Sequence, residues 1–220
     1  MADYQKINTL FKRDMSTNNI ILGDYTFPYF KTLENIEWEC TEKIDGTNIH
    51  IDIDWRDMND WSISFHGRTE RANIPAHLVT KLHQMFDNFN PNNVFTFKNP
   101  CFIQIFGEGY GVKIQKGGNY ISNDVDFILF DIRIGGMWLQ RESLEDIAPK
   151  LGVKIVPLMG YMTLLEAIEF VRSGFKSTIA ENKNYNAEGL VLKTRDGLLD
   201  RQGNRIITKL KTVDFDKLNK

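Results

Sequence analysis

Thr41-Glu42-Lys43-Ile44-Asp45-Gly46-Thr47-Asn48 is the stretch around which the rest of the chain is organised. A lysine amine can act as a nucleophile, but with a pKa of about 10.4 it is almost fully protonated at neutral pH unless burial or a neighbouring cation favours the neutral form. Asp45 stands two residues after Lys43, so on an extended chain it lies on the same side, where it can orient the amine or help to hold a metal. Gly46 lets the backbone pass close to a ligand. Taken alone, an ordinary lysine–aspartate pair at a strand end explains this pattern better.

Strands are predicted on both sides of this stretch, over residues 37–41 and 48–55. In the second, apolar residues at positions 49, 51, 53 and 55 alternate with His50, Asp52 and Asp54, which is typical of a strand with one solvated face. The two aspartates lack the glycine spacing of an EF-hand, so a calcium loop is not favoured. A further alternating strand over 61–65 is predicted to pair with this one through a turn at 57–60.

The remaining elements indicate an α+β protein of mostly antiparallel sheets with peripheral helices, in one domain covering residues 1–220. An apolar stripe predicts a helix over 74–89, and capping boxes at 143–146 and 163–166 predict two short helices. An apolar strand is expected over 101–106, before a glycine-rich stretch, and a buried strand over 126–134, before a Gly135-Gly136 hairpin turn. Further strands are expected over 190–193 and 205–211.

The composition narrows the possible functions. The chain has 220 residues, of which 42% are hydrophobic, and a formal net charge of −2, so any nucleic-acid surface has to be a local patch. Two isolated cysteines, Cys40 and Cys101, form neither a zinc site nor a disulfide framework, and free thiols are expected. No apolar run is long enough to predict a secretory signal or a membrane span. We therefore expect a soluble, cytoplasmic protein with no membrane partner.

The glycine-rich segment 107–118 fits neither the dinucleotide-binding nor the P-loop pattern, which removes the main support for kinase, P-loop and dinucleotide-fold readings. What remains is a group of charged residues, each next to an apolar strand. If these strand ends converge, the charged residues line one cleft. The group consists of Lys43, Asp45, Arg68, Glu108, Glu188, Lys209 and Lys211.

Taken in order, these segments resemble the motifs of the covalent nucleotidyltransferases, the superfamily of ATP-dependent polynucleotide ligases and capping enzymes. Any one motif is common by chance, but six in the same order over residues 37–211 are specific. The matching stretches are Lys43-Ile44-Asp45-Gly46, His66-Gly67-Arg68-Thr69, Phe106-Gly107-Glu108, Asp126-Phe127-Ile128-Leu129-Phe130-Asp131, Glu188-Gly189-Leu190-Val191 and Lys209-Leu210-Lys211.

The resemblance implies an ATP-grasp-like ligase adenylation domain, with antiparallel sheets flanking a nucleotide cleft. Lys43 would attack the α-phosphate of ATP and form a lysyl-adenylate. Lys209 and Lys211 would hold that phosphate and, as nearby cations, favour the neutral amine of Lys43. Together with Asp45, these three lysines are the predicted catalytic residues.

The resemblance also assigns nucleotide and metal contacts. Glu188 would bind Mg²⁺ or Mn²⁺, with Glu108 as a second metal ligand that also contacts the ribose. Arg68 would contact phosphate or the substrate end. Phe127 or Phe130 would stack on adenine; strand parity leaves these two side chains facing opposite ways, and Phe127 is favoured. The full predicted nucleotide-binding set is Glu42, Lys43, Gly46, Arg68, Glu108, Phe127, Glu188, Lys209 and Lys211.

Within the superfamily, residues 42–48 are similar to the Glu-Lys-x-x-Gly-Thr-Asn run of the phage-type RNA ligase 2 family. This favours an ATP-dependent RNA ligase for nucleic-acid repair, which joins a 5′-phosphate to a 3′-hydroxyl and acts in the host cytoplasm if phage-encoded. The best-known members carry histidine where this chain has Asp45, the residue shared by DNA ligases. A minimal DNA ligase and a nucleic-acid-binding descendant without ligase activity therefore remain as alternatives.

Only nine residues follow Lys211. We therefore expect neither an OB-fold nor the other C-terminal domain that RNA ligases of this branch carry. The expected protein is a monomeric catalytic domain that binds RNA or DNA ends or nicks, and a partner can supply the missing clamp.

Overall fold

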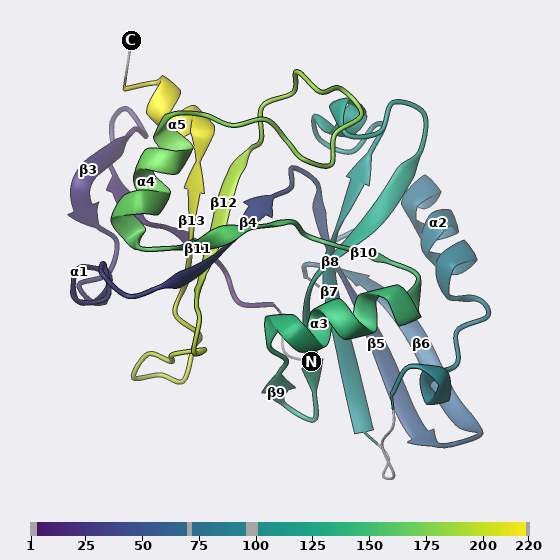
Figure 1. Ribbon diagram of the computed structural model, residues 1–220. Coiled ribbons are helices and arrows are strands. Elements are labelled where there is room, and N and C mark those ends of the chain that lie inside the picture. The colour runs from purple at the N-terminus through teal and green to yellow at the C-terminus, as the bar shows by residue number, and fades with distance from the viewer. Residues whose placement is uncertain (1–3, 70–71, 96–100, 219–220) are drawn as a thin grey trace. The chain divides into compact units, whose positions relative to one another are not determined.

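The computed structural model describes residues 4–69, 72–95 and 101–218, and within them the chain forms two compact units (Figure 1). Unit 1 consists of Tyr4 and Asp45–Val156, and unit 2 consists of Gln5–Ile44 and residues 157–218. Each unit has its own sheet, helices and core, and we describe each by itself. The predicted α+β class with mostly antiparallel strands is confirmed. One catalytic domain over residues 1–220 stays a prediction.

Unit 1 is built on a six-stranded sheet with the order β10-β8-β7-β5-β6, and β9 pairs with β8. All of its strand pairs are antiparallel except β10 with β8. The strands are β5 (Thr47–Asp57), β6 (Asp60–Gly67), β7 (Cys101–Gly111), β8 (Val125–Ile134), β9 (Met137–Trp138) and β10 (Lys154–Ile155).

The core of unit 1 lies between one face of this sheet and the helices α2 (Ala76–Phe86) and α3 (Arg141–Leu151). The alternation in β5 sends Ile49, Ile51 and Ile53 to this face, where they are fully buried with apolar side chains of both helices. Short 3₁₀ turns at Pro91–Asn93 and Gly117–Asn119 complete the unit. The residues between these isoleucines, His50 and Asp52 among them, belong to the opposite face.

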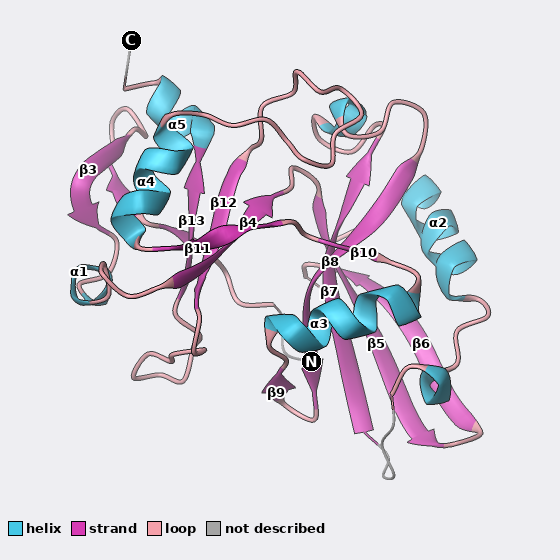
Figure 2. Cartoon of the chain, in the orientation of Figure 1, coloured by secondary structure: helices cyan, strands magenta, loops and turns pink. Residues whose placement is uncertain are grey.

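Unit 2 contains a five-stranded sheet with the order β1-β13-β12-β4-β11 and a separate β2–β3 ribbon. Its strands are β1 (Asn8–Thr9), β2 (Phe11–Arg13), β3 (Ile20–Tyr25), β4 (Trp38–Lys43), β11 (Leu158–Met162), β12 (Gly189–Thr194) and β13 (Ile207–Lys211). Its helices are α1 (Tyr29–Thr32), α4 (Leu164–Arg172) and α5 (Thr212–Asp216), and Figure 2 shows α4 and α5 beside the sheet.

The core of unit 2 forms on the face of the sheet that carries alternate residues of β4, β12 and β13. These include Cys40, Leu190 and Leu210, which pack with Leu164 of α4 and Phe215 of α5. The residues between them along each strand therefore lie on the other face. This second face carries the predicted catalytic lysines.

Three local predictions need correction or refinement. Helix α3 begins at Arg141, with Gln140 as its N-cap and no side-chain cap, so the predicted box at 143–146 lies inside the helix; the box at Thr163 and Glu166 is confirmed. Strand β7 continues through the glycines to Gly111 instead of ending near Phe106. Both cysteines are free as predicted, although only Cys40 is buried, and this burial raises the pKa of its thiol to about 12.

Among the residues that the structure describes, no helix is long and apolar enough to cross a membrane.

Candidate active site

The predicted site residues are divided between the two units, because the chain passes from unit 2 to unit 1 between Ile44 and Asp45. Unit 2 carries Glu42, Lys43, Glu188, Lys209 and Lys211, and unit 1 carries Asp45, Gly46, Arg68, Glu108 and Phe127.

In unit 2, strand β12 lies between β4 and β13. The register places the last residue of β4 and the last residue of β13 on either side of the first residue of β12. Gly189 is opposite both Lys43 on β4 and Lys211 on β13. Glu188 immediately precedes this position, so its carboxylate is within reach of both strand ends. Three residues that are far apart in the sequence are thereby assembled by strand pairing alone.

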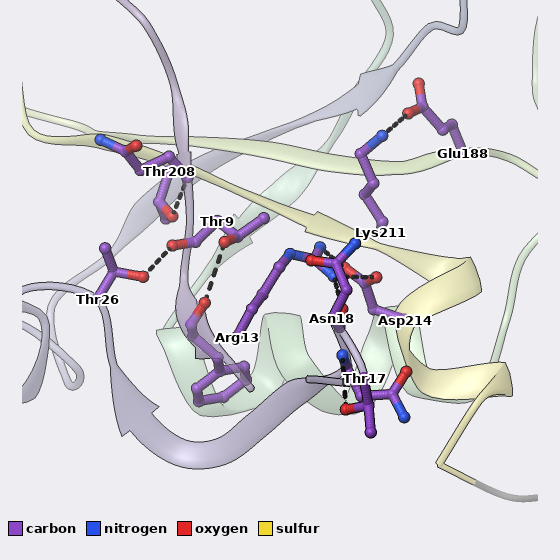
Figure 3. A network of polar contacts seen from close by, with 12 residues as sticks. Thr9, Arg13, Thr17, Asn18, Thr26, Glu188, Thr208, Lys211 and Asp214 are labelled. Carbon is purple, nitrogen blue, oxygen red and sulfur yellow. Dashed lines mark hydrogen bonds and ion pairs between the residues drawn. The ribbon is translucent and has the colours of Figure 1, made fainter. Parts of the chain in front are cut away.

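The Glu188 carboxylate bridges the two lysines. Its Oε2 lies 2.5 Å from Nζ of Lys43, and its Oε1 lies 2.7 Å from Nζ of Lys211, the contact drawn in Figure 3. The side chains of Lys43, Lys211 and Glu188 are 19%, 31% and 14% exposed, so water screens these charges less than on an open surface. The result is a compact group of two cations around one anion, open to solvent on one side.

Glycine is required at position 189 to form this arrangement. Its φ of +148° is in a region that side-chain-bearing residues rarely adopt, and an added Cβ would lie 1.9 Å from the carbonyl oxygen of Leu210. Thr212 holds the preceding residues, because its N–H donates to the Glu188 carbonyl at 2.9 Å and its hydroxyl donates to the Ala187 carbonyl at 3.0 Å. The backbone at Glu188 is therefore fixed from the side of β13.

The end of β13 is anchored by an ion pair from outside the predicted motifs. Helix α5 starts directly after Lys211, and its Asp214 accepts two hydrogen bonds, at 3.0 and 2.6 Å, from the Arg13 guanidinium on β2 (Figure 3). The Asp214 side chain is only 6% exposed. Such a bidentate pair has a defined geometry, so it limits the movement of the segment that presents Lys211.

Lys209 shares a face of β13 with Lys211, since the residue between them, Leu210, points into the core. Val191 is opposite Lys209 in the register. By the same alternation Lys43 and Lys193 point away from the core on β4 and β12. We call this set of four residues, Lys43, Lys193, Lys209 and Lys211, the lysine face of unit 2.

Glu42 has a different environment from the one predicted. Its side chain is almost fully buried, and the carboxylate accepts hydrogen bonds from the Ser177 hydroxyl at 2.5 Å and from the Thr178 N–H and hydroxyl at 2.9 and 2.6 Å. Both oxygens are therefore used to hold the loop that contains Ser177 and Thr178. The predicted nucleotide contact of this side chain conflicts with that arrangement, and we assign Glu42 to positioning this loop beside β4.

In unit 1, Gly46 serves close packing against β7. An added Cβ would lie 2.3 Å from the Gly109 carbonyl oxygen and 2.8 Å from Cγ of Glu108. The missing side chain of Gly46 therefore lets β7 of the protein itself, rather than a ligand, approach this backbone closely. As a result, Glu108 lies directly beside Gly46. The Asp45 N–H donates to the Tyr120 hydroxyl at 3.2 Å, which fixes the same segment from another side.

The other unit 1 residues differ in accessibility. Glu108 is half-buried and is opposite Asn48 of β5 in the register. Arg68 is exposed just beyond the end of β6, where its side chain can reach a ligand without displacing core residues.

Phe127 does not occupy the position predicted for it. The side chain is fully buried in the core of unit 1, and its ring fills the space where a Cβ on Gly107 would be, 2.3 Å from that position. A residue so enclosed cannot stack on a nucleotide. Phe130 is only partly buried and packs edge-to-face against Tyr4, which lies outside that core cluster. Phe127 and Phe130 face opposite sides of β8, as the strand alternation predicts, so the correction concerns only the choice of Phe127 as the stacking residue.

Sequence reasoning missed one group of side chains in unit 1. His50, Asp52 and His66 come together on the face of the sheet opposite the core. The available signal was the alternation of His50 and Asp52, combined with the expected pairing of their strand with the strand over 61–65, which ends just before His66.

A model of the RNA ligase family matches residues 36–211. The chain belongs to this family. The matched span begins one residue before the stretch covered by the six motifs and ends at the same residue, Lys211, so the RNA ligase family assignment and the motif order agree.

Solved structures of similar fold come from Naegleria gruberi RNA ligase. An arginine-to-alanine variant with ATP and Mn matches with a TM-score of 0.58 at 18% identity, over 100% of this chain and 58% of that one. The enzyme with PPi matches with a TM-score of 0.56 at 20% identity, over 98% and 63%. An apo lysine-to-alanine variant matches with a TM-score of 0.56 at 22% identity, over 86% and 54%. The chain thus spans little more than half the length of these proteins, and at such identities the likeness establishes the fold. No curated protein matches the chain.

Proposed function

We propose that this chain is an ATP-dependent RNA ligase that adenylates itself on Lys43, transfers the AMP to a 5′-phosphate end and seals that end to a 3′-hydroxyl. Membership of the RNA ligase family supports this proposal. So does the similarity in fold to RNA ligase structures with ATP and Mn, with AMP and Mn, and with PPi.

The observation that carries the proposal is the grouping of Lys43, Glu188 and Lys211. The predicted nucleophile is partly buried, and its Nζ shares one carboxylate with a second lysine. An isolated surface lysine would not need a glutamate anchored by Thr212 or a glycine in a conformation that other residues avoid. These features indicate a built site rather than a chance pair of charges.

The proposed first step forms a bond between Nζ of Lys43 and the α-phosphorus of ATP and breaks the bond from that phosphorus to the bridging oxygen of the β-phosphate. Pyrophosphate leaves, and the amine gives up its protons to solvent or to a nearby base. A 5′-phosphate oxygen of RNA then attacks the same phosphorus and the Nζ–phosphorus bond breaks. In the last step the 3′-hydroxyl attacks the activated 5′-phosphate, and AMP leaves.

The lysine face supplies the charge that this chemistry needs. Lys209 and Lys211 project on the same side as Lys43 and would hold the negative phosphate oxygens. Positive groups fixed where charge develops lower the barrier most when they are preorganised, because they need no rearrangement at the moment of reaction. The Arg13–Asp214 pair behind β13 contributes to this preorganisation.

The donor set also fits a divalent metal. Mg²⁺ and Mn²⁺ favour carboxylate oxygens, and Mg²⁺ is usually held by one or two carboxylates together with substrate phosphates. Glu188 would be the protein ligand on unit 2, and Glu108 is the proposed carboxylate of unit 1. When bound, such an ion would neutralise phosphate charge and orient the leaving pyrophosphate.

The remaining contacts in the proposal come from unit 1. Glu108 would accept hydrogen bonds from the ribose hydroxyls, and Arg68 would contact a phosphate of the nucleotide or of the RNA end. Phe130 takes the stacking role first predicted for Phe127. Asp45 would orient the amine, at the point where the chain passes from β4 to β5.

We further propose that the protein acts as a monomer in the cytoplasm, where its free thiols would be stable. A partner that supplies a clamp would increase its hold on nucleic acid.

A sealing assay tests the proposed function. Nicked duplexes that differ only in RNA or DNA at the 3′-hydroxyl side are incubated with the protein, ATP and Mg²⁺. We expect sealing of the RNA nick, with the DNA nick joined at least tenfold more slowly. The matched control is the same RNA nick without its 5′-phosphate, which should remain open. Faster joining of the DNA nick would instead identify a DNA ligase.

A further inference from the structure

Two histidines and an aspartate form a compact cluster in unit 1 that the proposed ligase chemistry does not use. One ligand atom from each of His50, Asp52 and His66 can be chosen so that all three lie within 4.8 Å of one another. Oδ2 of Asp52 is 3.9 Å from Nε2 of His50 and 3.7 Å from Nε2 of His66. The carboxylate oxygen is therefore shared between two imidazoles.

Strand pairing forces this grouping. His50 on β5 is directly opposite His66 on β6, and the two rings stack with centroids 4.8 Å apart. Asp52 follows two residues after His50, so it projects on the same face of the sheet. The cluster thus rests on two paired strands, which hold side chains more rigidly than a loop would.

The burial of the cluster calls for a chemical explanation. The His50 and Asp52 side chains are each only 4% exposed. Oδ1 of Asp52 accepts a hydrogen bond from Gln104 at 3.1 Å, whereas the buried Oδ2 has no hydrogen-bond partner among the described residues. Burying a carboxylate oxygen without a partner is costly, and buried charges are normally paired or bound to a metal. The Gln104 contact has the form of an outer hydrogen bond that orients a metal ligand.

We propose that His50, Asp52 and His66 bind a divalent first-row transition-metal ion, with Zn²⁺ and Co²⁺ as the best fit. Two imidazole nitrogens and one carboxylate oxygen are a ligand set that such ions favour and that Mg²⁺ does not. In a tetrahedral site with bonds of about 2.0–2.1 Å, ligand atoms are roughly 3.4 Å apart. The two separations that involve Asp52, 3.7 and 3.9 Å, would close by a few tenths of an ångström, and the third pair of ligand atoms, which lies within 4.8 Å, would have to approach to the same spacing.

One hydrogen bond would be exchanged on binding. Nε2 of His66 lies 2.8 Å from the Ser64 hydroxyl, and it would give up this contact to face the ion. His66 is 31% exposed, so it provides the route by which an ion enters from solvent. Three protein ligands leave at least one coordination position open for water or another oxygen ligand.

This site is distinct from the proposed metal ligands of the ligase reaction. His66 begins the motif that contains Arg68, but none of the three residues is given a role in adenylation, and the predicted metal-binding carboxylates of that reaction are Glu108 and Glu188. Metal binding at this site does not depend on ligase activity, and it can be tested without ATP and without RNA.

The test is a Co²⁺ titration of the full chain after treatment with EDTA, followed by visible absorption, with Zn²⁺ binding measured by calorimetry. We expect one equivalent of metal per chain and a rise in melting temperature on binding. Asp52→Asn and His66→Ala should each weaken binding at least tenfold. His83→Ala is the matched control, because His83 and Asp87 form an exposed pair at 3.5 Å that should not contribute.

Failure of the wild-type chain to bind one equivalent would overturn the proposal. So would binding that survives in both variants, or that is lost to the same extent in His83→Ala. If Asp52→Asn does not fold, His66→Ala decides the question, since this side chain is only partly buried. Circular dichroism of each variant shows whether the fold is retained.

Discussion

Nζ of Lys43 and Oε2 of Glu188 lie 2.5 Å apart, although 145 positions separate the two residues in the chain. Their contact is created by the antiparallel pairing of β4 with β12. The second oxygen of the same carboxylate pairs with Lys211, so one anion organises the proposed nucleophile and a neighbouring cation. This arrangement connects the sheet topology of unit 2 directly to the proposed chemistry.

Removing the charge of Glu188 should disable adenylation while the fold persists. We expect Glu188→Gln to lower the rate of AMP attachment by about 10²–10³-fold, the usual effect of losing one preorganised electrostatic contact. It should also raise the Mg²⁺ concentration needed for half-maximal rate. Single-turnover labelling with ATP measures both. Glu169→Gln, which removes a carboxylate 3.5 Å from Arg172 on the surface of α4, is the matched control and should react normally. A normal rate in Glu188→Gln would refute the assigned role.

The backbone at Gly189 should not tolerate even one added methyl group. Gly189→Ala combines an unfavourable φ with a clash against the Leu210 carbonyl, and we expect a loss of about 2–4 kcal/mol in the free energy of unfolding. Gly118→Ala is the control, because a Cβ there meets no atom within 4 Å, and its effect should stay within about 0.5 kcal/mol. Urea denaturation followed by tryptophan fluorescence compares the two, and equal stabilities would contradict the structure.

The two phenylalanines of β8 should separate stability from nucleotide binding. Phe127→Ala opens a cavity in the core of unit 1 and should cost about 3–5 kcal/mol of folding free energy. Phe130→Ala should leave most of the stability intact and raise the KM for ATP, since it removes the proposed stacking surface. Thermal melts and adenylation at varied ATP concentration distinguish these outcomes. An unchanged KM in Phe130→Ala would remove this residue from the site.

The sequence predicted the secondary structure well wherever a single hydrophobic periodicity extends over a whole segment. The alternation in 48–55 predicted β5, and each isoleucine faces the core of unit 1. The expected solvated face was wrong for His50 and Asp52, which are buried on the opposite side of the sheet, whereas Asp54 is exposed. The sequence was less informative where glycine and packing interact. Gly107 and Gly109 indicated the end of a strand, but they are part of β7. Their missing side chains make room for Phe127 and Leu78.

The order of the motifs identified the family, but local patterns could not reveal which partners each side chain finds. Glu42 precedes the proposed nucleophile and yet binds Ser177 and Thr178, a long-range contact with no local signal. The burial of Phe127 depends on the space left by the missing side chain of Gly107 on the neighbouring strand, which propensity does not predict. The histidine cluster likewise depends on the exact register of β5 with β6.

Arg13 should act as a positioning residue for Lys211. Arg13→Ala leaves Asp214 buried without its bidentate partner, so we expect a loss of about 1–3 kcal/mol in folding free energy. We also expect a lower adenylation rate at saturating ATP, which Arg13→Lys restores in part. Lys12→Ala is the matched control on the same strand, because its pair with Asp24 is exposed and contributes about 0–1 kcal/mol. A loss of stability without any change in rate would show that the pair only supports the fold.

The most direct test of the central claim is the intact mass of the purified protein after incubation with ATP and Mg²⁺. We predict that the wild-type chain gains the mass of one AMP through an acid-labile bond. Lys43→Ala should gain none while its circular dichroism is unchanged, and Lys31→Ala, which removes a different ion-paired lysine of unit 2, should be adenylated like the wild type. Normal adenylation of Lys43→Ala, or no adduct on the wild-type chain, would contradict the account.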